Sequence, residues 1–272
     1  MERLLAAQAD QDHATPENQQ RAEELIFQAW ETPDPHRRAE LAQQALELWG
    51  DCADGWVVLA ETVASSAREA FLCYAEGVAA GERALGEEAF KKDVGHFWGL
   101  LETRPYMRSR AGLADALTAM GETGEAIAHY RELLRLNPAD NQGIRYRLLK
   151  VLIECDRDEE ARELLQEYDR DILAEWAYNR ALLSFRHQGA TQASAEDCRA
   201  AIECNRFVPA YLFGRRRLPR QPPDYMGFGD NNEAICYAAA CKKLWQNTPG
   251  AIEWLKQCWS DQPNADSRDE EK

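Results

Sequence analysis

The stretch 110–138, RAGLADALTAMGETGEAIAHYRELLRLNP, decides the fold. It predicts two amphipathic helices joined by a glycine turn, and its proline ends the second helix. Small residues on both helices allow a close antiparallel approach, while an aromatic side chain fills the gap to the next pair of helices. The positions that carry this pattern are Ala114, Gly121, Ala126, Tyr130 and Pro138.

Neighbouring segments repeat the pattern with drift. A second unit has Asp156 in its turn and Ala161 in its second helix, and a third begins near Trp176 and turns near Gly189. Upstream, a further pair runs from Trp56 through the region of residue 77. This periodicity resembles the tetratricopeptide superfamily. The resemblance implies an all-α chain that forms a right-handed α-α superhelix of five to six helical pairs.

Cap and breaker residues place further helices. An apolar stripe over 17–30 includes Ile26 and Trp30, and more helices are expected over 36–49 and 193–206. Asp230, three residues before Glu233, predicts the start of another helix. Thr248 followed by Pro249 predicts the start of the last one.

The chain is expected to divide into six segments. They are a polar tail (1–16), N-terminal helical repeats with an insertion (17–103), tetratricopeptide-like repeats (104–214), an Arg/Pro/Gly-rich loop (215–229), a helical pair (230–260) and a disordered tail (261–272).

Charge excludes some partners. The 272 residues include 32 Lys and Arg against 47 Asp and Glu, a net charge of −15. A general nucleic-acid binder or a polybasic membrane-surface protein is therefore disfavoured. Residues 1–90 hold 18 acidic and 6 basic residues, whereas residues 91–229 hold 21 of each. No apolar run reaches membrane-spanning length and no signal peptide is recognised, so a cytoplasmic protein is expected.

The motifs predict neither catalysis nor a cofactor. The eight cysteines lack metal-ligand spacing and are expected to be buried thiols, and the five histidines are scattered. We expect no enzyme, no metal and no cofactor. His96, beside Phe97 and Trp98, leaves two alternatives open: an aromatic core plug, or a hydrolase-like site that uses His96 and a nearby cysteine.

The C-terminal half resembles a narrower family, the suppressor-of-tumorigenicity-7 family with its soluble bacterial relatives. The resemblance covers roughly 104–258. Its carrying stretches are residues 121–134, 160–169, 201–212, 229–238 and 245–255. It implies a scaffold role, and it supplies no catalytic residue.

The remaining hypothesis is a protein-interaction scaffold with a concave groove. In the tetratricopeptide superfamily the first helix of each pair lines that groove, and partners are held by charge-assisted hydrogen bonds. An acidic or C-terminal peptide is the expected partner. The predicted groove residues are Arg108, Tyr146, Lys150, Asn179 and Arg186.

Two further hypotheses concern other parts of the chain. The basic run Arg215, Arg216 and Arg217 is a candidate secondary contact. Self-assembly by stacking of the array ends, with Trp254 and Trp259 exposed, is the alternative to a scaffold for other proteins.

Overall fold

The computed structural model describes residues 15–260, and within that range every regular element is a helix. The predicted tails at 1–14 and 261–272 lie outside the described residues. The all-α prediction is confirmed. The helices are α2 (Pro16–Glu31), α3 (Pro35–Leu48), α4 (Ala53–Val63), α5 (Ala67–Lys92), the 3-10 helix η2 (Phe97–Gly99), α6 (Arg104–Met120), α7 (Thr123–Leu136), α8 (Ile144–Glu154), α9 (Asp158–Glu167), α10 (Ala174–Gln188), α11 (Gln192–Cys204), α12 (Val208–Leu212), α13 (Asn231–Asn247) and α14 (Ala251–Ser260).

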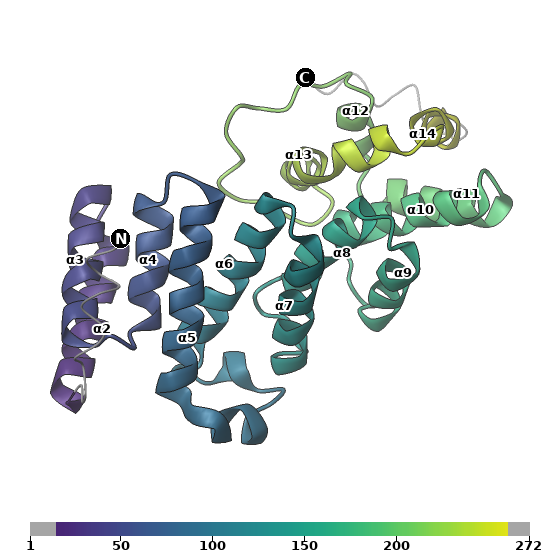
Figure 1. The fold of residues 1–272 in the computed structure, drawn as a ribbon. Coiled ribbons are helices and arrows are strands. Elements are labelled where there is room, and N and C mark those ends of the chain that lie inside the picture. Colours follow the sequence, from purple (N-terminus) through teal and green to yellow (C-terminus); the bar gives the residue numbers. More distant parts are fainter. Residues whose placement is uncertain (1–14, 261–272) are drawn as a thin grey trace. The chain divides into compact units, whose positions relative to one another are not determined.

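The described residues form two compact units, unit 1 up to residue 148 and unit 2 from residue 149, with the division inside α8. In unit 1, helices α2 to α7 follow one another as packed neighbours (Figure 1). In unit 2, α10 packs on α11 and α13, and α12 packs on α13. The segment boundaries expected from the sequence remain predictions.

Short polar side chains begin several helices. The Thr15 hydroxyl accepts a hydrogen bond from the Asn18 amide at the start of α2, and Asp34 caps α3 in the same way. The Asp230 carboxylate accepts from the amide of Glu233 at 2.7 Å, which confirms the predicted start of α13.

The turns between paired helices use a left-handed residue. Gly121 ends α6 at φ 84°, and Asp156 occupies the equivalent place after α8 at φ 57°. In each turn the next amide donates to the carbonyl four residues before the turn residue, at 2.9 Å. The predicted repeat is therefore present in the backbone hydrogen bonds of both turns.

The small and aromatic positions of the repeat form the core. Ala114, Ala126 and Tyr130 are all buried. Gly112 on α6 gives Tyr74 of α5 room, because a Cβ at this position would overlap the tyrosine ring. The close packing of α6 against α5 thus requires a glycine at position 112, because any other residue would add a Cβ.

The predicted start of the last helix is wrong. The Thr248 hydroxyl donates to the carbonyl of Leu244 at 2.9 Å, so Thr248 closes α13 instead of opening α14. Gly250, at φ 80°, then reverses the chain, and α14 begins at Ala251.

Candidate interaction surface

Arg108 joins three helices of unit 1. Its guanidinium on α6 forms two hydrogen bonds with the buried carboxylate of Asp54 on α4, one of them Nε to Oδ1 at 2.7 Å. The same guanidinium lies over the Trp30 ring of α2, 5.0 Å from its centroid. Burial raises the pKa of the Asp54 carboxyl, and Arg108 opposes that rise. Arg108 is therefore neutralised within the fold.

Trp30 belongs to an exposed face of α2. Phe27 is 63% exposed and Trp30 is 36% exposed, and their rings meet edge to face at 5.9 Å. Three exposed glutamates share this face at helical spacing. We call Glu23, Glu24, Phe27, Trp30 and Glu31 the α2 surface.

The surroundings of the α2 surface are acidic. Residues 15–63 contain ten acidic and three basic residues. Glu61 on α4 is partly exposed, with a carboxylate oxygen 3.6 Å from Arg38, and the burial of the rest of its side chain raises its pKa. Large exposed aromatic rings on an acidic helix face suit a basic, apolar partner better than an acidic one.

A second ion-pair contact of unit 1 links α6 to the start of α8. The Asp115 carboxylate accepts a hydrogen bond from the Tyr130 hydroxyl and one from the Arg147 guanidinium, both at 2.7 Å. Sequence reasoning missed Asp115 and Asp54 as partners because they lie 32 and 54 residues from the arginines that bind them.

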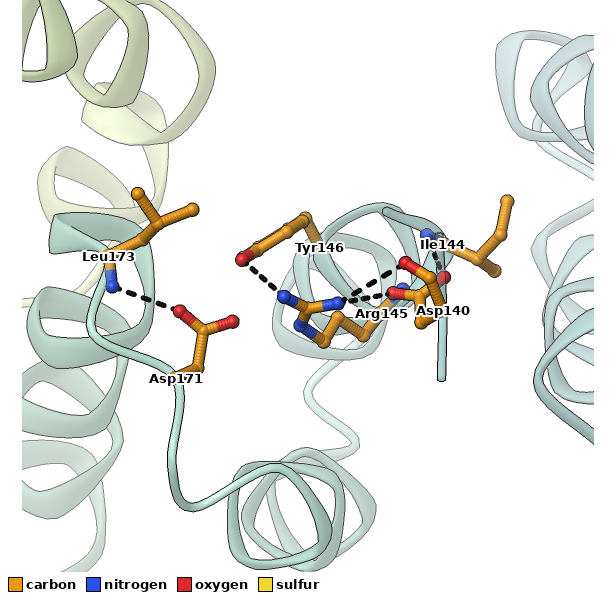
Figure 2. Close-up of polar contacts among 6 residues, drawn as sticks. All are labelled: Asp140, Ile144, Arg145, Tyr146, Asp171 and Leu173. Atoms are coloured by element: carbon orange, nitrogen blue, oxygen red, sulfur yellow. Dashed lines mark hydrogen bonds and ion pairs between the residues drawn. The ribbon is translucent and has the colours of Figure 1, made fainter. Parts of the chain in front are cut away.

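The predicted groove residue Tyr146 is held by its neighbour. Arg145 donates to the Tyr146 hydroxyl at 2.7 Å and lies 4.4 Å over its ring (Figure 2). Arg145 also contacts the buried carboxylate of Asp140, which accepts from the Ile144 amide at 2.7 Å. This network fixes the first turn of α8.

In unit 2 the expected exposure of Asn179 is corrected. Its side chain is buried, because α13 covers this part of α10. Tyr237 donates to the Asn179 carboxamide oxygen at 3.0 Å, and Trp245 donates to the Tyr237 hydroxyl at 2.8 Å. The carboxamide is part of the core and is not accessible from the surface.

The other two predicted residues of unit 2 differ in accessibility. Lys150 is half-buried, with its amine 3.9 Å from Glu154. Arg186 is mostly buried; it donates to the carbonyl of Ile153 at 3.1 Å and pairs with Asp158 at 2.9 Å. It connects α10 to the end of α8 and the start of α9. Arg186 therefore stabilises the packing of these helices.

The arginines of the basic run differ in their contacts. Arg215 lies 4.9 Å over the Trp259 ring, and Arg216 donates to the Asn231 carboxamide at 3.1 Å. Arg217 and Arg220 are exposed and form no ion pair with the described residues. Arg215 and Arg216 thus anchor this loop, whereas Arg217 and Arg220 remain available for contact with a partner.

The same loop presents apolar side chains that the sequence reasoning did not single out. Tyr225, Met226 and Phe228 are 76%, 50% and 73% exposed. The backbone around them is fixed: Asn232 donates to the carbonyl of Tyr225 at 2.9 Å, and Asp230 accepts from the amide of Gly227 at 2.8 Å. We call Arg217, Arg220, Tyr225, Met226 and Phe228 the loop surface.

The loop is tied to the core by Glu233. This buried carboxylate accepts from the amide of Ala174 at 3.0 Å, from the Asn205 carboxamide at 2.8 Å and from the amide of Gly229 at 2.8 Å. Hydrogen bonds and the start of α10, rather than a cation, compensate the charge of Glu233.

Unit 2 also contains an open cleft of about 380 Å³ between α9, α10 and α11. Leu165 and Leu183 give it apolar walls, and its charged lining residues are Arg162, Asp169, Arg180 and Asp197. The cleft contains both signs of charge, so it selects no ligand class by charge.

The residues considered for catalysis are dispersed. The His96 side chain is exposed, whereas Phe97 is buried against Phe90 at 5.2 Å and Tyr106 at 6.2 Å. Five of the eight thiols are buried, and burial raises the pKa of Cys52 to about 12. Between residues 15 and 260 no cluster of three His, Cys, Asp or Glu side chains is placed to hold a metal ion.

The paired helices, their left-handed turns and the small-residue packing define a tetratricopeptide-like helical protein. The crystal structure of YrrB, a TPR protein with an unusual peptide-binding site, aligns with a TM-score of 0.50 and 17% identity. The alignment covers 73% of this chain and 90% of that one. The chain belongs to the ST7 protein family, whose model matches residues 3–268. The relationship therefore extends well beyond the 104–258 expected from the sequence motifs.

Individual relatives of the chain carry the name of the same family. The suppressor of tumorigenicity 7 protein-like of Bos taurus is 28% identical over 257 residues, which cover 86% of this chain and 46% of that protein. The ST7 homolog of Drosophila melanogaster is 28% identical over 282 residues, covering 94% and 52%. The chain spans about half the length of these relatives. Among residues 15–260, no helix has the length and apolar character needed to cross a bilayer.

Proposed function

We propose that this protein is a protein-interaction scaffold and that the α2 surface is where it binds a partner. The observation that carries the proposal is the exposed pair Phe27 and Trp30: Arg108 of α6 lies over the Trp30 ring, and the Phe27 ring packs edge to face on Trp30. Aromatic rings with fixed orientation bury much area at little entropic cost, which is typical of binding hot spots. The fold supports the same function, because tetratricopeptide-like arrays serve as binding scaffolds.

The partner's chemistry follows from the surroundings of these rings. Glu23, Glu24 and Glu31 are exposed on the same helix face and form no ion pair with the described residues. An apolar segment that also carries Lys or Arg would match both features. The acidic or C-terminal peptide expected from the sequence matches less well, because Asp54 neutralises Arg108 and Arg186 is engaged inside unit 2.

Phage display of random peptides on the immobilised protein tests the proposal. Selection should enrich peptides that combine aromatic and basic residues. Their affinity should fall by about tenfold or more in Phe27→Ser, a loss of about 1.4 kcal/mol that is ordinary for an interface aromatic.

The matched control is Leu101→Ser, which removes another highly exposed apolar side chain of unit 1. The proposal fails if the selected peptides bind Phe27→Ser and Leu101→Ser equally well. It also fails if selection enriches acidic peptides.

The free thiols of the chain support a reducing compartment, and we propose the cytoplasm as its place of action. The hydrolase alternative has no observation in its favour among residues 15–260, since His96 is exposed and its neighbour Phe97 is a core residue.

A further inference from the structure

We propose that the α2 surface of one molecule binds the loop surface of a second copy of the same chain. This inference rests on the proposed function and identifies one partner for that surface. The two surfaces belong to different units of the chain, and the proposed contact is between two molecules. It joins Phe27 and Trp30 of one copy to Tyr225, Met226 and Phe228 of the next.

The loop surface has the properties of a binding surface. Three large apolar side chains lie within four consecutive residues, each at least half exposed. Their backbone is held by Asp230, Asn232 and the buried carboxylate of Glu233. A loop that is already ordered loses little conformational entropy on binding. Exposing three such side chains together without a partner is unfavourable for a monomer in water.

Charge selects the occupant. Arg217 and Arg220 are exposed and form no ion pair with the described residues, and the same is true of Glu23, Glu24 and Glu31 on the α2 surface. Each surface therefore combines aromatic rings with unpaired charge, and the two signs are opposite. A second copy therefore offers each surface apolar side chains to pack against and charges of the opposite sign.

Where each copy uses its two patches toward two different neighbours, the contact is heterologous. Heterologous contacts add subunits in a chain or ring instead of stopping at a two-fold dimer. The tryptophans expected to stack array ends are not part of it. Trp254 and Trp259 are buried, against Phe185 at 4.6 Å and Phe213 at 5.9 Å respectively.

Sedimentation equilibrium of the full chain tests the proposal. The average mass should rise with protein concentration at about 0.05 M NaCl and fall toward the monomer at about 0.5 M, where the screening length is roughly 4 Å. The double variant Arg217→Glu with Arg220→Glu should weaken association by at least about tenfold at low salt. The pair Arg170→Glu with Arg199→Glu changes the net charge equally at exposed sites of unit 2 and should leave association unchanged.

Charge exchange makes the test specific. Glu23→Arg with Glu24→Arg should likewise weaken association at low salt, and mixing this protein with the Arg217→Glu, Arg220→Glu protein should restore it. All of these side chains are exposed, so the variants are expected to fold, which circular dichroism checks. A second variant without charge changes, Phe228→Ser, should weaken association at low salt.

A monomer at every concentration and salt overturns the proposal, and so does association that the mixture of charge-exchanged proteins fails to restore. These results leave the function proposed above intact if Phe27→Ser still loses the selected aromatic and basic peptides. Loss of peptide discrimination together with monomeric behaviour overturns both.

Discussion

At the residue scale, the packing of α6 against α5 requires that residue 112 has no Cβ. In Gly112→Ala the new methyl group would overlap the ring of Tyr74, which lies between α5 and α6. We expect a loss of about 1–3 kcal/mol in the free energy of unfolding, typical of overpacking. Urea unfolding followed by circular dichroism measures it.

The control is Gly124→Ala, also in a helix, where the added Cβ meets no atom within 4 Å. This change should be neutral or stabilise by up to about 1 kcal/mol, since alanine favours the helix. Similar losses in the two variants would contradict the packing explanation.

His129 makes the stability depend on pH. Its pKa is lowered by burial on α7 and by the nearby Arg110 cation, so the folded state resists protonation. As the pH falls below the unfolded value of about 6.5, the unfolded chain takes up the proton more readily than the folded chain, and stability is lost.

We therefore expect the melting temperature of His129→Gln to fall less than that of the natural protein between about pH 7.5 and pH 5.5. Differential scanning calorimetry gives both slopes. His187→Gln removes an exposed histidine and should keep the natural slope. An unchanged slope in His129→Gln would refute the assignment.

At the scale of elements, one carboxylate holds several helix ends together. Glu233 joins the first amide of α10, the residue that caps α11 and the loop before α13. In Glu233→Gln the amide group would point a donor at groups that are themselves donors. We expect a loss of about 2–3 kcal/mol, the cost of leaving buried polar groups unsatisfied.

Glu203→Gln is the matched control, since Glu203 is an exposed helical glutamate in the same unit. Its unfolding free energy should change by less than about 0.5 kcal/mol. Equal stability of the two variants would show that the network contributes little.

Helix pairing was predictable from the sequence because its causes are local. Ala114, Gly121 and Ala126 lie within one pair of helices, and their spacing alone predicts both packing and turn. Asn179 was misplaced because the helix that covers it begins 52 residues later in the sequence. Trp30 was expected in an apolar stripe, but it is partly exposed, and local spacing could not reveal its contact with Arg108, 78 positions away.

At the scale of the whole molecule, the two compact units predict two unfolding events. Each unit has its own buried residues, with the division inside α8. Gly112→Ala should lower the midpoint of the transition of unit 1 alone, and Glu233→Gln that of unit 2 alone.

Hydrogen exchange by mass spectrometry during urea unfolding separates the two. It reports which peptides lose protection at each denaturant concentration. A single transition that both variants shift equally would mean that the chain unfolds as one cooperative structure.

The loop before α13 is also a place where the chain can be cut by a protease. Its exposed Arg217 and Arg220 are sites where trypsin can cut, while contacts on either side hold the ends. Tyr211 bonds to Asn231 at 2.9 Å, and Lys242 donates to the carbonyl of Tyr211 at 2.8 Å. Brief digestion should therefore yield two fragments that separate on a denaturing gel yet elute together as one native particle. Non-covalent contacts hold α12 against α13 even if the loop between them is cut. The protein is therefore a candidate for expression as two separate fragments that associate.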